Sequence, residues 1–475
     1  MATATSVDHI AAERLPPEGR AALRGGVFGN YVDQIHIFLP LVALAPALTT
    51  LAGPHAGAST GAIVVMAMLL GRPVGGMVFG RIADRLGRTR TTRLAIAGTA
   101  TCSLGIALTP THDVIGPAAI VIVLVLRFLG GVFIAGEYSA AIPLAMEWSR
   151  ARHRGLFSGL IMAMAPWAQA SIAFATLGLL LALGPDAYAA YGWRLSFLTG
   201  ALASLVMLAY YRRHVADAPL FRRHGVPAVT AGELATTPPA RTPTTTRASV
   251  ATAAPTTPPG LWALLTGRWR RAFWQMFGLM TGLWFLTQMT VIALPARLKT
   301  DVALTPTQLS IAMGAAAVAQ ALGMSLTGHL STRTGRRAFF VAAGVVATIA
   351  GPLAWQWTVG RGALGPAALG ASVLQVLTVT AYGPIGAYLS ERFPTVVRAT
   401  GYGTAYSLSI VIPALHPFYL PTLQDWLGRD GAVVGLLVLG GLLVAACGAL
   451  GPRLSPADLD ADVEVVASRH QPVHA

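Results

Sequence analysis

Charged residues are scarce in this chain of 475 residues. Only 11% of the residues are charged, 54% are hydrophobic, and the mean hydropathy is +0.60. Soluble domains carry about 25% charged residues, so this chain cannot cover itself with a polar surface and the lipid bilayer is its expected solvent. A net charge of +15 would suggest nucleic acid binding in a soluble protein. Here the cations cluster between apolar runs, so we expect no nucleic acid partner.

Cysteine and lysine are also nearly absent. Cys102 and Cys447 both lie in apolar runs, which argues against a disulfide framework or a zinc site. Lys299 is the one lysine among many arginines, as is typical of a high-GC bacterial genome. The first 20 residues are polar, so we expect no cleavable signal peptide and a first span that targets the chain itself. No nucleophile–base or metal-ligand cluster appears, so neither an enzyme nor a cofactor is expected.

Long apolar runs are abundant, and a membrane helix needs about 20 such residues. The sequence predicts an all-α membrane protein with twelve transmembrane helices. The expected spans are 27–52, 58–80, 93–110, 117–145, 156–183, 193–211, 273–295, 308–330, 338–359, 364–388, 401–423 and 431–450.

Arginines gather in alternate loops between these spans. Examples are Arg85 and Arg88 after the second span, Arg154 after the fourth and Arg333 after the eighth. Because cytoplasmic loops carry the excess of cations, both termini are expected in the cytoplasm, and the chain in a bacterial inner membrane.

The stretch 214–270 divides the chain into two parts. Its middle is rich in Ala, Thr and Pro, a composition that does not fold by itself. We expect a cytoplasmic linker that acts as a tether, with a regulatory role as the alternative. The predicted units are an N-terminal tail 1–26, a six-helix half 27–213, the linker 214–270, a second six-helix half 271–450 and a C-terminal tail 451–475.

The two halves carry the same motifs at nearly the same offset. A glycine- and arginine-rich segment begins at Gly80 and again at Gly328, 248 residues later, and Glu147 is followed by Arg154 as Glu391 is by Arg398, 244 residues later. Such parallel repeats indicate duplication, with pseudo-two-fold symmetry and a substrate site between the halves.

The first of these motifs is predicted to form a conformational latch. Glycines allow two helix ends to approach closely, and Asp84 can pair with arginines or cap a helix. The alternative is an ordinary positively charged turn. In the second copy Thr332 replaces the acid, so that latch is weaker or differently built. The latch residues are Gly80, Asp84, Arg85, Gly87, Arg88, Arg333 and Arg336.

Four linked motifs resemble the major facilitator superfamily, and within it the metabolite:proton symporter group that includes proline/betaine, α-ketoglutarate, citrate and shikimate carriers. The motifs begin at Arg72, Arg127, Gly192 and Glu391 and read RPVGG, RFLGGVFIAGEY, GWR and ERFPTVVRATG. The resemblance covers about residues 29–450 and implies the major facilitator fold and proton-coupled transport. One departure lies in the first span, where Asp33 stands at the family's usual glutamate and His36 at its usual aspartate.

Polar side chains inside the expected spans mark the candidate site, because charges in a membrane are costly unless paired or functional. Asp33 and His36 share a helix face and are predicted to form a proton relay, or else a static pair. Arg127 is predicted to hold a substrate carboxylate or to pair with Asp33, and Arg72 to pair with Glu137 or to snorkel. The candidate residues for substrate binding or proton coupling are Asn30, Asp33, His36, Arg72, Arg127, Glu137, Gln288, Gln375, Tyr382 and Tyr406.

The last four candidates lie in the second half, where amides and phenols would orient a polar substrate or simply join helices. Together these patterns favour a monomeric, proton-coupled symporter of a small carboxylate-bearing metabolite, with H⁺ as the coupling ion and no cofactor. The alternative is an efflux antiporter, which would favour a wide apolar cavity over a charged one. A membrane sensor is disfavoured, because no folded signalling domain is evident.

Overall fold

The protein is described by a computed structural model that covers residues 15–54, 56, 58–218 and 261–453. Within these ranges the chain forms helices and short connections, with no β-strand. Most of the predicted linker and both chain ends lie outside the described residues, so the expectations placed on them stay predictions.

The first part of the chain, up to residue 214, folds into long helices joined by short turns. These are α2 (Pro17–Val42), α3 (Leu48–Ala52), α4 (Ala58–Leu86), α5 (Arg88–Leu108), α6 (His112–Ile115), α7 (Ala118–Trp148), α8 (Ala151–Leu183), α9 (Pro185–Ala187), the π-helical segment η2 (Tyr188–Gly192) and α10 (Trp193–His214).

The second part, from residue 261, repeats this pattern with more interruptions. It contains α12 (Leu261–Leu265), α13 (Arg270–Thr287), the π-helical η3 (Gln288–Ala293), α14 (Leu294–Thr300), α15 (Pro306–Thr334), α16 (Arg336–Val359), α17 (Leu364–Thr378), η4 (Thr380–Tyr382), α18 (Ile385–Arg392), η5 (Thr395–Val397), α19 (Arg398–Leu408), α20 (Val411–Ala414), α21 (His416–Leu427) and α22 (Arg429–Ala449).

Nine of the described helices are long and apolar enough to cross a membrane, and a tenth span results if α2 and the bent η1–α3 segment (Ala45–Ala52) count as one. The other two predicted spans fall on α5, which opens with three arginines, and on α19–α21, which breaks near Pro413 and Pro417. Helix α2 begins at Pro17 rather than at residue 27. Proline suits the first turn of a helix, and the glycines at 25, 26 and 29 had obscured the helix in the sequence.

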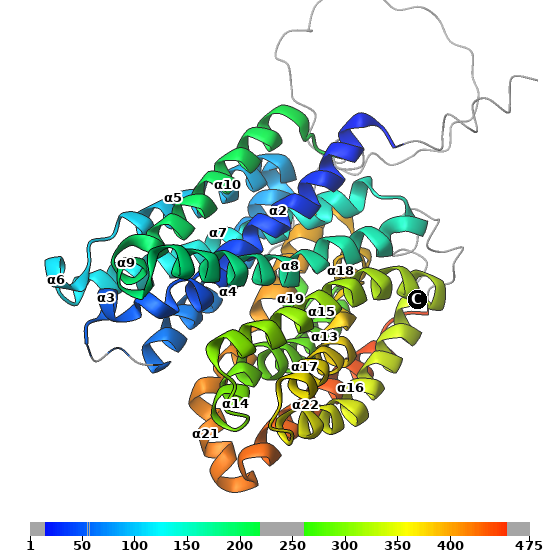
Figure 1. Ribbon diagram of the computed structural model, residues 1–475. Helices are drawn as coiled ribbons and strands as arrows, with labels where there is room; N and C mark the ends of the chain where they lie inside the picture. The colour runs from blue at the N-terminus through cyan, green and yellow to red at the C-terminus, as the bar shows by residue number, and fades with distance from the viewer. Residues whose placement is uncertain (1–14, 55, 57, 219–260, 454–475) are drawn as a thin grey trace, which may run out of the picture.

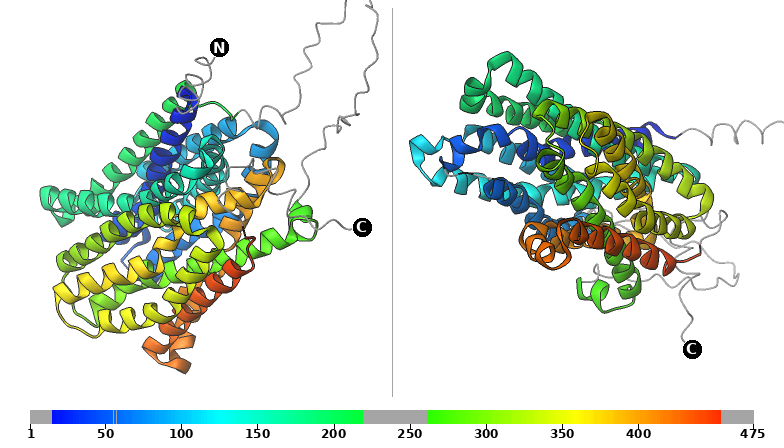
Figure 2. Two further views of the ribbon diagram at one scale, coloured as in Figure 1. Left: turned by 90° about the vertical axis from the view of Figure 1, so that its right-hand side faces the viewer. Right: turned by 60° about the horizontal axis from the view of Figure 1, so that its bottom comes forward.

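Helices α2–α10 lie on one side of the molecule and α13–α22 on the other (Figures 1 and 2). Two symmetric contacts join them: α4 packs on α19, and α15 packs on α8. Glycines allow both, because a Cβ on Gly80 would lie 2.7 Å from Thr400 Cα and a Cβ on Gly328 would lie 2.6 Å from Gly159 Cα.

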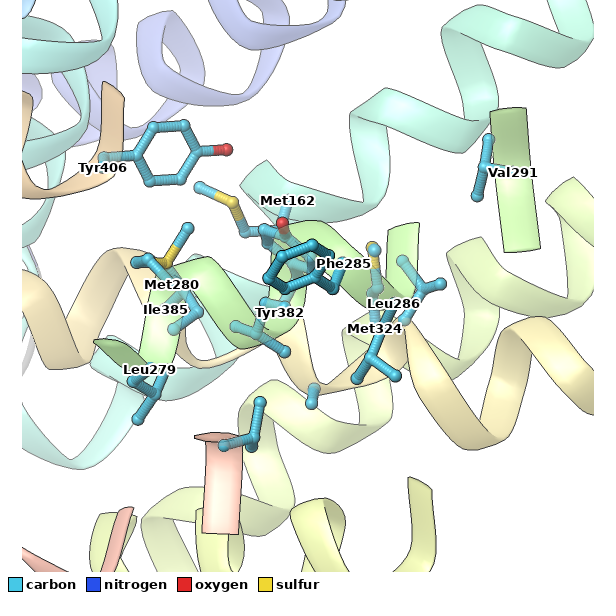
Figure 3. Close-up of a cluster of buried hydrophobic side chains, with 14 of the residues drawn as sticks. Met162, Leu279, Met280, Phe285, Leu286, Val291, Met324, Tyr382, Ile385 and Tyr406 are labelled. Atoms are coloured by element: carbon cyan, nitrogen blue, oxygen red, sulfur yellow. The ribbon is translucent and has the colours of Figure 1, made fainter. Parts of the chain in front are cut away.

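The largest buried apolar cluster belongs mainly to the second half and extends into the first. Figure 3 shows Met162 of α8 in this cluster with Met324 and Tyr382 of the other half. The two halves therefore share a continuous core beside the site described next.

Candidate functional site

A central cavity of about 110 Å³ lies between the halves. Its lining comes from both of them and includes four residues expected from the sequence: Arg72, Gln288, Tyr382 and Tyr406. Among the described lining residues Arg72 alone is charged, and most of the wall is apolar. The expectation that several charged side chains line the cavity is therefore wrong, because the other charged candidates are buried within the first half and do not line it.

Close packing of α4 against α7 positions Arg72. A Cβ on Gly75 would lie 2.1 Å from the Val132 carbonyl oxygen, and one on Gly131 would lie 2.0 Å from that of Met68. Only glycine permits such an approach of two backbones. Arg72, on the same helix as Gly75, thereby lies directly against Tyr138 of α7.

The Arg72 guanidinium is enclosed by aromatic rings. Its Cζ lies 5.1 Å from the ring centre of Tyr138 and 5.4 Å from those of Trp284 and Tyr406. The Tyr406 hydroxyl accepts a hydrogen bond from it, but Nε and Nη2 are buried without a partner in the described structure. Since buried polar groups are nearly always paired, these two donors could bind an anionic group.

Asp33 and Glu137 form a carboxyl pair at the crossing of α2 and α7. Both are buried, and their side chains share a hydrogen bond. Two carboxylates cannot donate to one another, so a hydrogen bond between them would need a proton on one of the two. The expected pairing of Glu137 with Arg72 is thus absent.

The neighbouring residues on the same two helices connect this pair to the cavity. Gln34 donates a hydrogen bond to the Tyr138 hydroxyl, and both side chains line the cavity. The Asp33–Glu137 and Gln34–Tyr138 contacts are therefore adjacent pairs that join α2 to α7. A change of protonation in the Asp33–Glu137 pair acts one residue away from the Gln34–Tyr138 contact.

Arg127 and His36 lie in the first half, away from the cavity lining. Arg127 donates to the His36 carbonyl oxygen (2.8 Å) and to Met68 Sδ (2.6 Å), and His36 Nε2 is 2.8 Å from Ser204 Oγ. The expected Arg127–Asp33 pair is not formed, and the expected Asp33–His36 relay is replaced by the carboxyl pair. The spacing of Asp33 and His36 indicated that they share a face of α2, but it did not indicate which helices pack against that face.

Two other candidates join helices. Asn30 donates to the Ile161 carbonyl oxygen at 2.5 Å, and Gln375 donates to that of Thr290 at 3.2 Å. Neither lines the cavity. The second contact supports the π-helical segment η3, whose first residue, Gln288, does line it.

The predicted latch is formed as an inter-half clasp at one end of the molecule. Asp84, at the end of α4, accepts hydrogen bonds from the Ala399 nitrogen (3.0 Å) and from the nitrogen (2.8 Å) and hydroxyl (2.7 Å) of Thr400. A side chain of the first half thus caps α19 of the second.

Glu147 completes the clasp. Its Oε1 contacts Arg88 of its own half and Arg398 of the other, at 2.5 Å from Arg398 Nη1, and all three side chains are buried. Arg88 also donates to the Thr395 carbonyl oxygen across the interface at 3.0 Å. The other carboxylate oxygen of Glu147, Oε2, is buried without a hydrogen-bond partner among the described residues, so the network is not fully satisfied.

The second copy is built differently, as the loss of the acid suggested. Arg336 makes two hydrogen bonds of 3.0 and 3.1 Å to Glu391 and one of 3.3 Å to Thr332, within its own half. Across the interface Arg154 lies 3.8 Å from Glu391, and Ser158 Oγ bonds the Gly383 carbonyl oxygen at 2.6 Å. Arg85 and Arg333 are exposed and are not part of the clasp contacts.

The opposite end of the molecule is hollow. A vestibule of about 610 Å³ shares Leu41, Val65, Leu69, Gln288 and Ile292 with the central cavity, so the two are continuous. The site therefore opens away from the clasp. Sequence reasoning missed Gln34, Gln169 and Tyr138 as lining residues, although Gln34 and Tyr138 directly follow the two acids it selected.

The profile of the Major Facilitator Superfamily matches residues 34–291. The chain therefore belongs to this superfamily of membrane transporters, which bind small molecules within the membrane, and it is a transporter rather than an enzyme. The predicted fold class and family are confirmed.

Curated relatives span nearly the same length. The inner membrane metabolite transport protein YhjE of Escherichia coli is 25% identical over 94% of this chain and 97% of its own. The ectoine/proline transporter ProP of Corynebacterium glutamicum is 24% identical over 83% and 76%. Among solved structures, the proton:xylose symporter XylE has a TM-score of 0.69 at 14% identity, over 91% of this chain and 94% of its own, and shares the fold.

Proposed function

We propose that the chain is a proton-coupled symporter of a small carboxylate-bearing metabolite. The observation that carries this proposal is Arg72, a buried guanidinium with two unpaired donors in a cavity that holds no other charge. A guanidinium offers two parallel N–H donors to one carboxylate. The proline and ectoine transported by the named relative carry such a group, which supports the choice of substrate class.

The coupling step uses the Asp33–Glu137 pair. With one shared proton the pair holds Gln34 and Tyr138 in their present contact, beside Arg72. Substrate enters through the vestibule and pairs with Arg72, and the halves then rock about the loaded site. Loss of the proton leaves two buried like charges, which destabilises this arrangement and favours release.

The proposed orientation follows from the positively charged loops. The clasp then faces the cytoplasm together with both termini, and the vestibule faces the periplasm. The described state is outward-open, ready to accept substrate and proton from the same side. We also propose that the protein acts as a monomer.

Uptake into proteoliposomes tests the proposal. Vesicles with an alkaline interior are given labelled L-proline, glycine betaine, citrate or α-ketoglutarate. We expect uptake of at least one carboxylate to depend on the pH gradient, and Arg72→Gln to lower it at least tenfold. Arg361→Gln, which removes an exposed arginine stacked on Trp357, is the matched control. Uptake that is indifferent to both pH gradient and voltage contradicts proton coupling.

A second candidate function, efflux antiport, is favoured by the apolar wall of the cavity. In efflux antiport the substrate and the proton cross the membrane in opposite directions, whereas in symport they cross in the same direction. In everted membrane vesicles acidified inside, an antiporter accumulates an apolar cation such as ethidium while protons leave, whereas the symporter proposed above does not.

A further inference from the structure

Two glycines one turn apart on α2 make room for buried polar groups of other helices. A Cβ on Gly29 would lie 2.9 Å from Glu137 Oε1 and 3.8 Å from the Tyr211 hydroxyl, and one on Gly25 would lie 3.1 Å from that hydroxyl. Both oxygens therefore surround the same point on the α2 surface. They are therefore at most 6.7 Å apart (2.9 Å plus 3.8 Å), a gap that ordered water could connect.

Tyr211 is one of four tyrosines whose buried hydroxyl has no hydrogen-bond partner among the described residues, the others being Tyr382, Tyr402 and Tyr419. The residue is fully buried near the end of α10. Most tyrosines at buried positions pair this group. An unpaired phenol aimed at a carboxyl pair that holds a proton calls for an explanation.

Beyond Tyr211 lies a pocket of about 410 Å³ at the clasp end of the molecule. Residues adjoining Gly25 and Tyr211 line it: Ala21 and Arg24 on α2, and Tyr210 and His214 on α10. Other groups near Tyr211 are the acids Asp33 and Glu137, and Arg93 of α5, which donates to the Tyr211 carbonyl oxygen at 2.9 Å. Tyr211 itself is fully buried and does not line this pocket, whereas its neighbour in the chain, Tyr210, does.

We propose that Tyr211 relays the proton of the Asp33–Glu137 pair to the clasp side of the membrane, along a route inside the first half that the substrate does not use. The proposal rests on the proton coupling proposed above. The protonated carboxyl gives its proton to the phenol oxygen while the phenol proton passes to water in the pocket. Tyr211 ends neutral, the pair gains one negative charge, and one hydronium forms.

The relay also explains the separation of the two routes. Substrate can leave towards the clasp side only when the contacts of Asp84 and Glu147 open, whereas Glu137, Tyr211 and the pocket are all within the first half. A proton can therefore leave the pair towards the clasp side without the opening of the clasp that the substrate requires.

Proteoliposomes selected to expose the clasp face are mixed rapidly with alkaline buffer, and the infrared band of the protonated carboxyl pair is followed in time. The band is assigned by its loss in Glu137→Gln. We expect Tyr211→Phe to slow its decay at least tenfold, with the band itself retained. The control is Tyr188→Phe, which removes an equally buried hydroxyl that donates to the Ala43 carbonyl oxygen at 2.7 Å.

An unchanged decay in Tyr211→Phe overturns the relay and leaves the symport proposal standing. Equal slowing in Tyr188→Phe also overturns it, because the effect is then structural. Absence of any band that depends on Glu137 contradicts the proton carrier itself, and so the proposed coupling. If Tyr211→Phe does not fold, Tyr211→Met, which also lacks a hydroxyl, provides the same comparison.

Discussion

At the scale of single residues, the site depends on which charged side chain reaches the cavity. Five acidic, basic or histidine candidates inside the spans were evident in the sequence, but of these five only Arg72 lines the central cavity. Its side chain combines a charge, contact with three aromatic rings and a fork of donors. Any cation would supply the charge, but the flat shape that stacks on a ring and the fork of donors belong to a guanidinium.

Arg72→Lys therefore separates charge from geometry. Lysine keeps the positive charge but loses the stack and the paired donors, so we expect the apparent affinity for the transported carboxylate to fall at least tenfold, which corresponds to about 1.4 kcal/mol. Concentration-dependent uptake measures it. Arg361→Lys is the control, and equal affinity in Arg72→Lys and the unchanged protein would contradict a forked contact.

A second residue-scale prediction concerns the loop after α14. Partial burial acts to raise the pKa of Asp301, but hydrogen bonds from Thr300 and Arg297 and the charges of Arg297 and Arg429 outweigh it and lower the pKa below the ordinary 3.8. A lowered folded-state pKa stabilises the protein above 3.8 and this stability is lost as the pH falls below it.

We therefore expect Asp301→Asn to lower the unfolding temperature at pH 6 and to have a smaller effect as the pH falls below 3.8. Thermal unfolding followed by tryptophan fluorescence at several pH values measures this convergence. Asp186→Asn, in the other half, removes a carboxylate for which the structure has no such cluster of arginines. If the unfolding temperatures of the variant and the unchanged protein differed equally at every pH, a stabilising role of the ionised Asp301 carboxylate would be contradicted.

At the scale of elements, the π-helical segment η3 is a feature that no apolar pattern predicts. It holds Gln288 against the cavity, and Gln375 of α17 bonds its Thr290 carbonyl oxygen. Short π segments often occur at functional sites.

Gln375→Leu should thus act on stability and not on recognition. It leaves a buried carbonyl without its partner, which costs about 1–3 kcal/mol, and a lower unfolding temperature is expected with unchanged apparent affinity for substrate. Gln288→Leu, which alters the cavity wall, should show the reverse. A large loss of apparent substrate affinity in Gln375→Leu would instead indicate that Gln375 belongs to the substrate site.

Sequence reasoning identified most elements because apolar length alone defines a span such as α7. It identified the clasp because the glycine- and arginine-rich segment at Gly80 recurs at Gly328, and because Asp84 has a physical reason to cap a helix or pair with arginines. It did not identify the contact partners of polar side chains, because these depend on which helix packs opposite. The spacing of Asp33 and His36 fixes a common face, but only packing showed that one meets Glu137 and the other Ser204.

At the scale of the whole molecule, the balance between two states depends on the clasp. Asp84 is charged and accepts three hydrogen bonds from the other half. Hydrogen bonds to charged groups contribute about 1.5–3 kcal/mol, so Asp84→Asn should shift the balance towards the state with an open clasp by roughly tenfold or more.

Spin labels at positions 49 and 424, which line the vestibule from either half, measure this shift as a growing population of short distances. The control is Asp217→Asn. Asp217 likewise accepts from a backbone nitrogen (2.8 Å) and a hydroxyl (2.9 Å), both of Thr89, but within one half. Equal shifts in the two variants would contradict a role of Asp84 in the balance.

The cap that Asp84 places on α19 has a consequence for observing transport. The amide protons of Ala399 and Thr400 are held by a carboxylate that belongs to the other half, and they must lose it whenever the halves part at that end. Their rate of exchange with heavy water therefore rises with the population of molecules whose clasp is open. Amide exchange at these two peptide groups thus reports on the transport cycle without a label, a substrate or a mutation.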